Sequence, residues 1–126
     1  MNKKYFIALC IIALHFTASA AISDTDAVRA IIGESAGQTF QEKLAIAGAL
    51  RNRAMLTGVR GFRNNRMINA QPVAIWCQAR AAWAQSSTND ISHGATHWES
   101  SNFKRPDWSQ DMKITARVGV FVFYRP

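Results

Sequence analysis

The sequence predicts a single α+β domain in which helices come first and a small antiparallel sheet follows. Apolar residues recur every three or four positions after two helix-start signals, at residues 23–26 and 39–42. Near the C-terminus, residues 112–124 alternate between apolar and polar side chains and then become continuously apolar and aromatic, which is typical of strands. No repeat or low-complexity tract interrupts this pattern, so one domain accounts for it.

The first two helices are expected on either side of a glycine-containing turn. Ser23 suits the start of the first, whose apolar residues Ala27, Val28, Ile31 and Ile32 have helical spacing. Thr39 and Glu42 form a capping-box pattern before the second. An apolar run rich in small residues then predicts a helix over 44–56 that ends near Gly58.

A third helix is expected after a loop rich in arginine and asparagine at residues 59–71. Pro72 suits the first turn of this helix, and Trp76, Ala79 and Trp83 then share one face. Cys77 lies beside Trp76 in this apolar stretch and is expected to be a small core residue.

The remaining chain is expected to form the sheet. Residues 95–98 predict a short strand, and 100–107 predict a loop that carries Pro106. Between residues 113 and 118 apolar and polar side chains alternate, and Gly119 is expected to form a turn before the last strand.

Residues 1–20 have the pattern of a secretory signal. Lys3 and Lys4 form the basic region, residues 5–16 are apolar, and Ala18-Ser19-Ala20 is a small-residue cleavage site. We therefore expect a secreted or periplasmic domain of residues 21–126 without a stable membrane anchor. An uncleaved N-terminal anchor is the alternative.

The charge balance favours an anionic partner. Without Lys3 and Lys4, the 15 basic side chains become 13 against 8 acidic ones, a net charge of +5. Exported basic proteins meet polyanions in the bacterial envelope, including the carboxylates of peptidoglycan. Nucleic acid is not expected, because the arginines are scattered and no motif interleaves aromatic and basic residues. No metal site is expected either, since Gly94 interrupts the spacing of His93 and His97.

Glu34 is the candidate with the clearest chemistry. It follows Gly33 at the end of the first helix, on the same side as Ala27 and Ile31. A carboxyl group in such a partly apolar position is suited to donate a proton. The alternative is a helix-end glutamate that binds a backbone amide or an arginine.

The order of four motifs resembles the SleB/CwlJ-type cell wall hydrolase family. The segment Ile32–Gly37 is similar to the family's "YGEARGE" element, and Leu44–Arg53 to the "AVAAVVLNR" helix that follows it. Further matches are "GATHFY…P.W" and the C-terminal "HxFYR" strand, found here at Gly94–Glu99 with Pro106–Trp108 and at Val120–Arg125. The four matches span nearly all of residues 21–126 in the family's order.

This resemblance implies a lysozyme-like fold and cleavage of the β-1,4 bond between N-acetylmuramic acid and N-acetylglucosamine in peptidoglycan. Glu34 matches the family's catalytic glutamate, and the implied reaction is that of a lytic transglycosylase, which needs no cofactor. The partners expected are peptidoglycan glycan strands, and the chain is expected to be a monomer. Three departures bear on activity: Ser35 replaces the usual alanine, Gln38 replaces a second acid, and Gly119–Val120 replaces a polar or histidine-bearing turn.

The resemblance suggests further substrate-binding residues, each with a structural alternative. Those expected near Glu34 are Thr96, His97, Trp98, Glu99 and Tyr124. Trp98 or Trp108 would pack against a sugar ring, although both also fit a core role. Asp90 and Glu99 are candidate second carboxylates, and a turn role is favoured for each. Arg53 either binds a substrate carboxylate or caps its helix end, and the cap is favoured. A non-catalytic peptidoglycan-binding module is the alternative to the enzyme.

Overall fold

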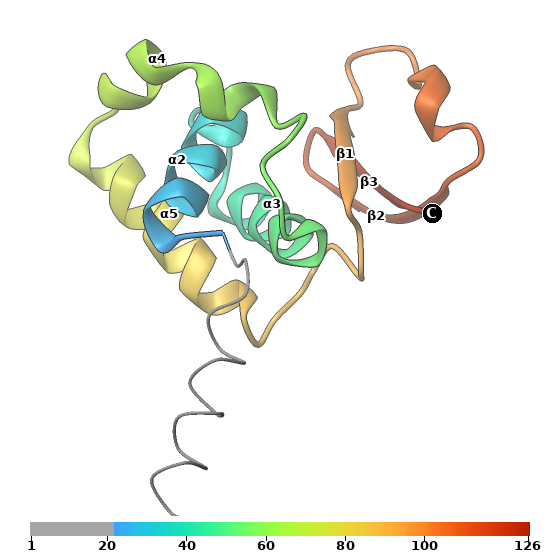
Figure 1. Cartoon of the computed structure of the whole chain (residues 1–126), viewed down its shortest axis with the longest axis horizontal. Helices are drawn as coiled ribbons and strands as arrows, with labels where there is room; N and C mark the ends of the chain where they lie inside the picture. The colour runs from blue at the N-terminus through green and yellow to red at the C-terminus, as the bar shows by residue number, and fades with distance from the viewer. Residues whose placement is uncertain (1–21) are drawn as a thin grey trace, which may run out of the picture.

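A computed structural model describes residues 22–126, and the predicted signal segment lies outside these described residues. Within these residues, helices precede a three-stranded antiparallel sheet in the α+β order that the sequence predicts, with four helices where three were expected (Figure 1). The helices are α2 (Asp24–Ser35), α3 (Phe40–Arg53), α4 (Asn65–Asn69) and α5 (Val73–Ser86). Within residues 22–126 every helix is too short or too polar to cross a bilayer.

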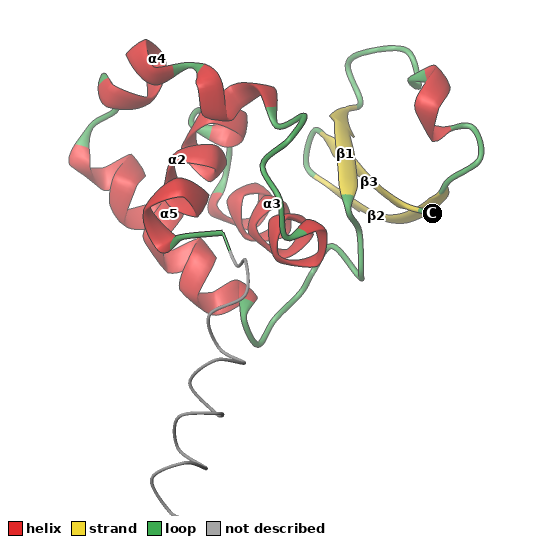
Figure 2. Ribbon diagram, viewed as in Figure 1, coloured by secondary structure: helices red, strands yellow, loops and turns green. Residues whose placement is uncertain are grey.

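Helix α3 lies between the other helices and the sheet (Figure 2). It packs against α2 and α5 on one side and against the first two strands on the other. Every residue from Glu42 to Leu50 is buried. Small side chains such as Ala45 and Ala47 let both layers approach closely, as the sequence pattern indicates.

The sheet has the strand order β1-β3-β2. Its strands are β1 (His97–Ser100), β2 (Lys113–Val118) and β3 (Phe121–Arg125), and Gly119 makes the β2–β3 turn with a φ of 55°. The short strand begins two residues later than predicted. A bulge between Ile114 and Ala116 breaks the predicted alternation in β2, so Ile114 is exposed.

Three local expectations were wrong. Helix α3 ends at Arg53, before the predicted stop near Gly58, because Ala54 adopts a left-handed conformation. The predicted loop at 59–71 contains a 3₁₀ turn, η1 (Arg60–Arg63), and helix α4, which Arg29 binds through the side chains of Asn65 and Asn69. Cys77, expected in the core, is exposed on α5.

Two consecutive charged residues at the start of α3 are buried. Lys43 is fully buried, and its ammonium donates to the carbonyl oxygens of Ala36 (3.1 Å) and Gln38 (2.6 Å) just beyond the end of α2. Glu42 completes the predicted capping box with Thr39 and accepts a hydrogen bond from the Val120 N–H at 3.1 Å. The start of α3 is therefore bound both to the end of α2 and to the β2–β3 turn.

Hydrogen bonds keep Glu42 ionised. Burial alone would raise the pKa of the Glu42 carboxyl, but backbone N–H groups of Val120 and Thr39 donate to it. The Thr39 hydroxyl and the charge of the adjacent Lys43 act in the same direction, so the pKa lies below its ordinary value. A carboxylate with a lowered pKa stabilises the folded state above its ordinary pKa, and this contribution is lost as the pH falls through the folded value.

A glycine–glycine contact joins α2 to η1. A Cβ atom at Gly33 would overlap the carbonyl group of Gly61, and a Cβ at Gly61 would overlap the carbonyl of Gly33. The two backbones therefore touch in a way that only glycine permits at either position. This contact places η1 against the last turn of α2, beside Glu34.

We expect Gly61→Ala to lower the melting temperature by at least about 5 °C, because overpacking against rigid backbone costs about 1–3 kcal/mol. Gly37→Ala is the matched control, since a Cβ there meets no atom within 4 Å. Thermal unfolding followed by circular dichroism compares the two. Equal melting temperatures for both variants would contradict the close contact.

We expect Glu42→Gln to lower the melting temperature at neutral pH. The melting temperature of the variant should also change less with pH in the acid range than that of wild type. The difference from wild type should narrow as the pH falls below the ordinary glutamate pKa and through the lower pKa of the folded carboxyl, where the wild-type carboxylate takes up its proton. Asp111→Asn, at an exposed position, is the control. A difference that stays constant until the wild type itself unfolds in acid would show that the charge of Glu42 is not its cause.

Candidate active site

A cleft of about 430 Å³ separates the end of α2 from the sheet. Its lining comes from α2, the end of α3, the segment leading into η1, β1, the loop before β2, and the start of β3. The lining residues are Glu34, Arg53, Gly58, Val59, Arg60, His97, Trp98, Glu99, Ser100, Trp108, Met112 and Phe121.

Glu34 lies in the last turn of α2 and is half-buried. The Gly61 N–H donates to Oε1 of Glu34 at 3.1 Å, which is ordinary hydrogen-bond length. The indole Nε1 of Trp98 lies 3.5 Å from Oε2, at the long limit for a hydrogen bond. One carboxyl oxygen is thus held by the backbone, while the other has only a weak contact with Trp98, which lines the cleft together with Glu34.

Strand β1 forms the opposite wall. His97, Trp98 and Glu99 all line the cleft, so the structure brings three of the predicted substrate-binding residues together with Glu34. The Nδ1 atom of His97 lies 2.8 Å from the Thr96 hydroxyl, and its ring packs on Trp108 at a centroid distance of 5.5 Å. Burial and the charge of Arg53 lower the pKa of His97, so the imidazole is neutral at pH 7.

Thr96 and Tyr124 do not line the cleft. The Thr96 hydroxyl contacts His97, and the Thr96 backbone joins β3 through Tyr124. Tyr124 is only 3% exposed, and its ring packs edge-on against Trp108 at 5.4 Å. Both residues therefore support the cleft-lining side chains of His97 and Trp108 from behind.

The two candidate second carboxylates lie in different places. Asp90 accepts hydrogen bonds from the side chain of Asn52, from the N–H and hydroxyl of Ser92, and from the N–H of Gly94. Burial opposes ionisation of Asp90, yet these bonds lower its pKa, and it lies outside the cleft lining. Glu99 does line the cleft, where its Oε1 accepts the N–H of Ser100 at 2.9 Å.

Arg53 hydrogen-bonds to carbonyl groups outside its own helix, so the expected helix cap is wrong. Its Nη2 donates to the Thr57 carbonyl beyond the end of α3, and its Nη1 donates to the Thr96 carbonyl at 3.3 Å. The buried Nε atom has no hydrogen-bond partner within residues 22–126. Arg53 therefore ties the end of α3 to the entry of β1 and places a positive charge beside His97.

Sequence reasoning missed the contributions of Arg60 and Gly61. Both lie in the arginine- and asparagine-rich segment that the sequence predicts as a loop, and no local pattern indicates that Gly61 meets Gly33. The presence of glycine at both positions 33 and 61 is the signal in the sequence that is compatible with this contact. Trp108, considered as a sugar-packing residue, is 44% exposed and lines the cleft. Among residues 22–126, no three His, Cys, Asp or Glu side chains are grouped as metal ligands would be.

Comparisons with known proteins give structural neighbours only. No family model matches the sequence, and no curated protein is significantly similar to it. The catalytic domain of the Bacillus cereus SleB protein superposes with a TM-score of 0.59 at 18% identity, covering 85% of this chain and 97% of that one.

A second solved structure gives the same result. The catalytic domain of the germination-specific lytic transglycosylase SleB from Bacillus anthracis has a TM-score of 0.61 and 18% identity, and the match covers 81% of this chain and 93% of that one. The chain that contains the family-like motifs therefore has the fold that the resemblance implies. The chain has the α+β fold of the SleB catalytic domains.

Proposed function

We propose that this protein cleaves the glycan strands of peptidoglycan, as a lytic transglycosylase with Glu34 as general acid and base. The observation that carries the proposal is the carboxyl group of Glu34, fixed through one oxygen by the Gly61 N–H and open to the cleft through the other. The fold shared with a lytic transglycosylase catalytic domain supports the same reaction. Export after cleavage at Ala20 belongs to the proposal, because peptidoglycan lies outside the cytoplasmic membrane.

The reaction needs one acid. Oε2 of Glu34 gives its proton to the glycosidic oxygen as the bond between that oxygen and C1 of the muramic residue breaks. The C6 hydroxyl of the same sugar then bonds to C1 and returns its proton to Glu34, leaving a 1,6-anhydro end. Because the attacking oxygen belongs to the substrate, the effective concentration of the nucleophile is high and no carboxylate is needed to activate water.

The other cleft residues have supporting roles in this proposal. The glycosidic oxygen would displace the weak contact between Trp98 and Oε2, which leaves the indole to pack against the sugar. Neutral His97 can donate or accept a hydrogen bond with a sugar hydroxyl. The exposed ring of Trp108 offers an apolar surface, and the positive charges of Arg53 and Arg60 suit a strand that carries carboxylates.

We expect Glu34→Gln to reduce the release of soluble fragments from purified sacculi by at least about 10²-fold, since the amide cannot transfer the proton. Its melting temperature should match wild type, because the amide oxygen still accepts the Gly61 N–H. Glu99→Gln is the matched control in the same cleft. If Glu34→Gln digests sacculi at the wild-type rate, Glu34 is not the acid.

We expect the products to carry 1,6-anhydro-muramic ends both in wild type and in Glu99→Gln. Mass spectrometry of the released muropeptides distinguishes these ends from reducing ends, which are heavier by one water. Reducing ends that disappear in Glu99→Gln would instead identify a two-carboxylate hydrolase. A wild-type protein that binds sacculi and releases no fragments would support the non-catalytic alternative.

A further inference from the structure

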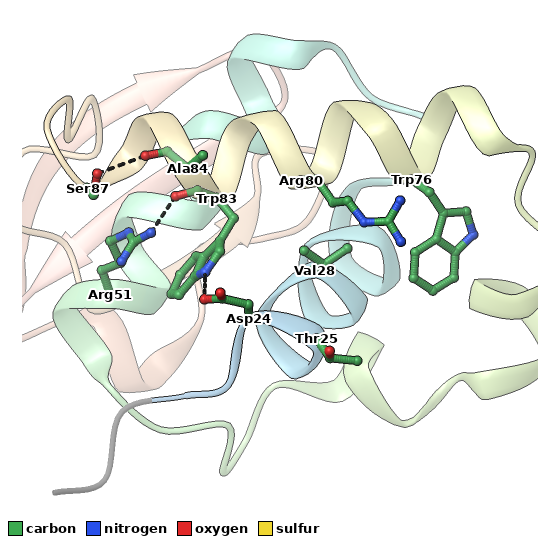
Figure 3. A pocket seen from close by; sticks show the side chains of 9 residues that line it. All are labelled: Asp24, Thr25, Val28, Arg51, Trp76, Arg80, Trp83, Ala84 and Ser87. Carbon is green, nitrogen blue, oxygen red and sulfur yellow. Dashed lines mark hydrogen bonds between the residues drawn. The ribbon is translucent and has the colours of Figure 1, made fainter. Parts of the chain in front are cut away.

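A second hollow lies at the opposite end of α2 from Glu34. It has a volume of about 550 Å³ and opens between α2, α5 and the last part of α3 (Figure 3). Asp24, at one edge, precedes Glu34 by ten residues, which is about 15 Å along a helix. None of its lining residues lines the cleft, and its volume lies within the range of small-molecule sites. We call this hollow the Trp76 groove.

One face of α5 forms a wall of the Trp76 groove. Trp76, Arg80, Trp83 and Ala84 recur at helical spacing and all line it, over about 12 Å of helix. Figure 3 shows Arg80 and Trp76 at one end of the groove and Trp83 at the other, with Val28 of α2 between them. The groove therefore follows α5, with the apolar side chain of Val28 between its two ends.

At the Trp83 end of the groove, the lining side chains contact one another. The Trp83 indole donates to Oδ1 of Asp24 at 2.8 Å. The guanidinium of Arg51 lies 3.7 Å from the centroid of the Trp83 ring and donates to the Trp83 carbonyl and the Ser86 hydroxyl. Trp83 is therefore held between Asp24 on one side and Arg51 on the other, and both charged side chains line this end of the groove.

The Trp76 end is open and positively charged. Arg80 is exposed, and its guanidinium carbon lies 5.7 Å from the centroid of the Trp76 ring without a hydrogen bond to any described residue. The guanidinium carbon of Arg29 lies 5.9 Å from the same ring, and Asn65 and Asn69 hold it in place. A flat, half-exposed indole thus lies near two guanidinium groups, and Arg80 has all its donors available.

We propose that the Trp76 groove binds an anionic saccharide, with a sugar ring against Trp76 and its carboxylate at Arg80. The C–H face of a sugar ring is apolar and packs on an indole, while a guanidinium pairs with a carboxylate through two parallel hydrogen bonds. Three arginines against one aspartate give the surroundings the required charge. The inference rests on the proposed function only for the source of the saccharide, the muramyl peptides of the cell wall.

The test follows the indole N–H signals of the tryptophans by NMR. The ¹⁵N-labelled exported protein carries Glu34→Gln to prevent turnover. It is titrated with N-acetylmuramyl-tripeptide, with trigalacturonate as a second acidic sugar and with neutral chitotriose. We expect the Trp76 signal to shift with the muramyl peptide and to stay in place with chitotriose. A shift with trigalacturonate as well would show that any acidic sugar suffices.

Arg80→Glu should weaken the affinity for the muramyl peptide, measured from the shift of the Trp76 signal, by about tenfold. This is the effect expected for loss of a charge-assisted contact. Arg66→Glu, the same charge change at an exposed position on α4, should leave the affinity unchanged. Melting temperatures establish that both variants are folded.

The possible outcomes separate the two proposals. A shift at Trp98 with none at Trp76 overturns the groove and leaves the proposed function intact. A shift at Trp76 that Arg80→Glu weakens supports the groove even if the wild-type protein cleaves no glycan. Equal weakening by Arg66→Glu, or a Trp76 shift caused by a single-stranded oligonucleotide and not by the muramyl peptide, overturns it.

Discussion

The buried pair Glu42 and Lys43 connects the two halves of the molecule. Lys43 binds the carbonyl groups that end α2, and Glu42 binds the turn between β2 and β3. Burying two charges costs free energy. The cost is tolerated here because each charged side chain forms hydrogen bonds with backbone groups that would otherwise lack partners. The helix that carries Glu34 and the sheet that faces it are therefore both hydrogen-bonded to the first turn of α3.

The cleft depends on this arrangement because its two walls are distant in the sequence. Glu34 comes from the end of α2, whereas His97 and Trp98 come from β1 more than 60 residues later. The contact between Gly33 and Gly61 adds the third component, a backbone N–H that orients the carboxyl group. The proton donor proposed above must be held in a narrow range of positions, and three independent segments restrain the Glu34 carboxyl group.

The end of α3 also connects the two hollows of the molecule. Arg51 and Arg53 are two residues apart, so they project from nearly opposite sides of the helix. Arg53 lines the cleft beside His97, and Arg51 lies against Trp83 in the Trp76 groove. A single helix end thus supplies positive charge to both surfaces, which suits an anionic polymer long enough to contact the protein at more than one place.

The sequence by itself determined the α+β order, the capping box of Thr39 and Glu42, the Gly119 turn and the identity of Glu34 as the candidate acid. These features depend on residues near one another along the chain, where helical spacing and turn chemistry act. Only the tertiary structure decided which candidates share a cleft: His97, Trp98 and Glu99 do, whereas Tyr124 packs behind them and Asp90 organises a loop. It also decided that Arg29 binds residues 65 and 69 and that Gly33 meets Gly61, because such long-range contacts leave no periodic signal in the sequence.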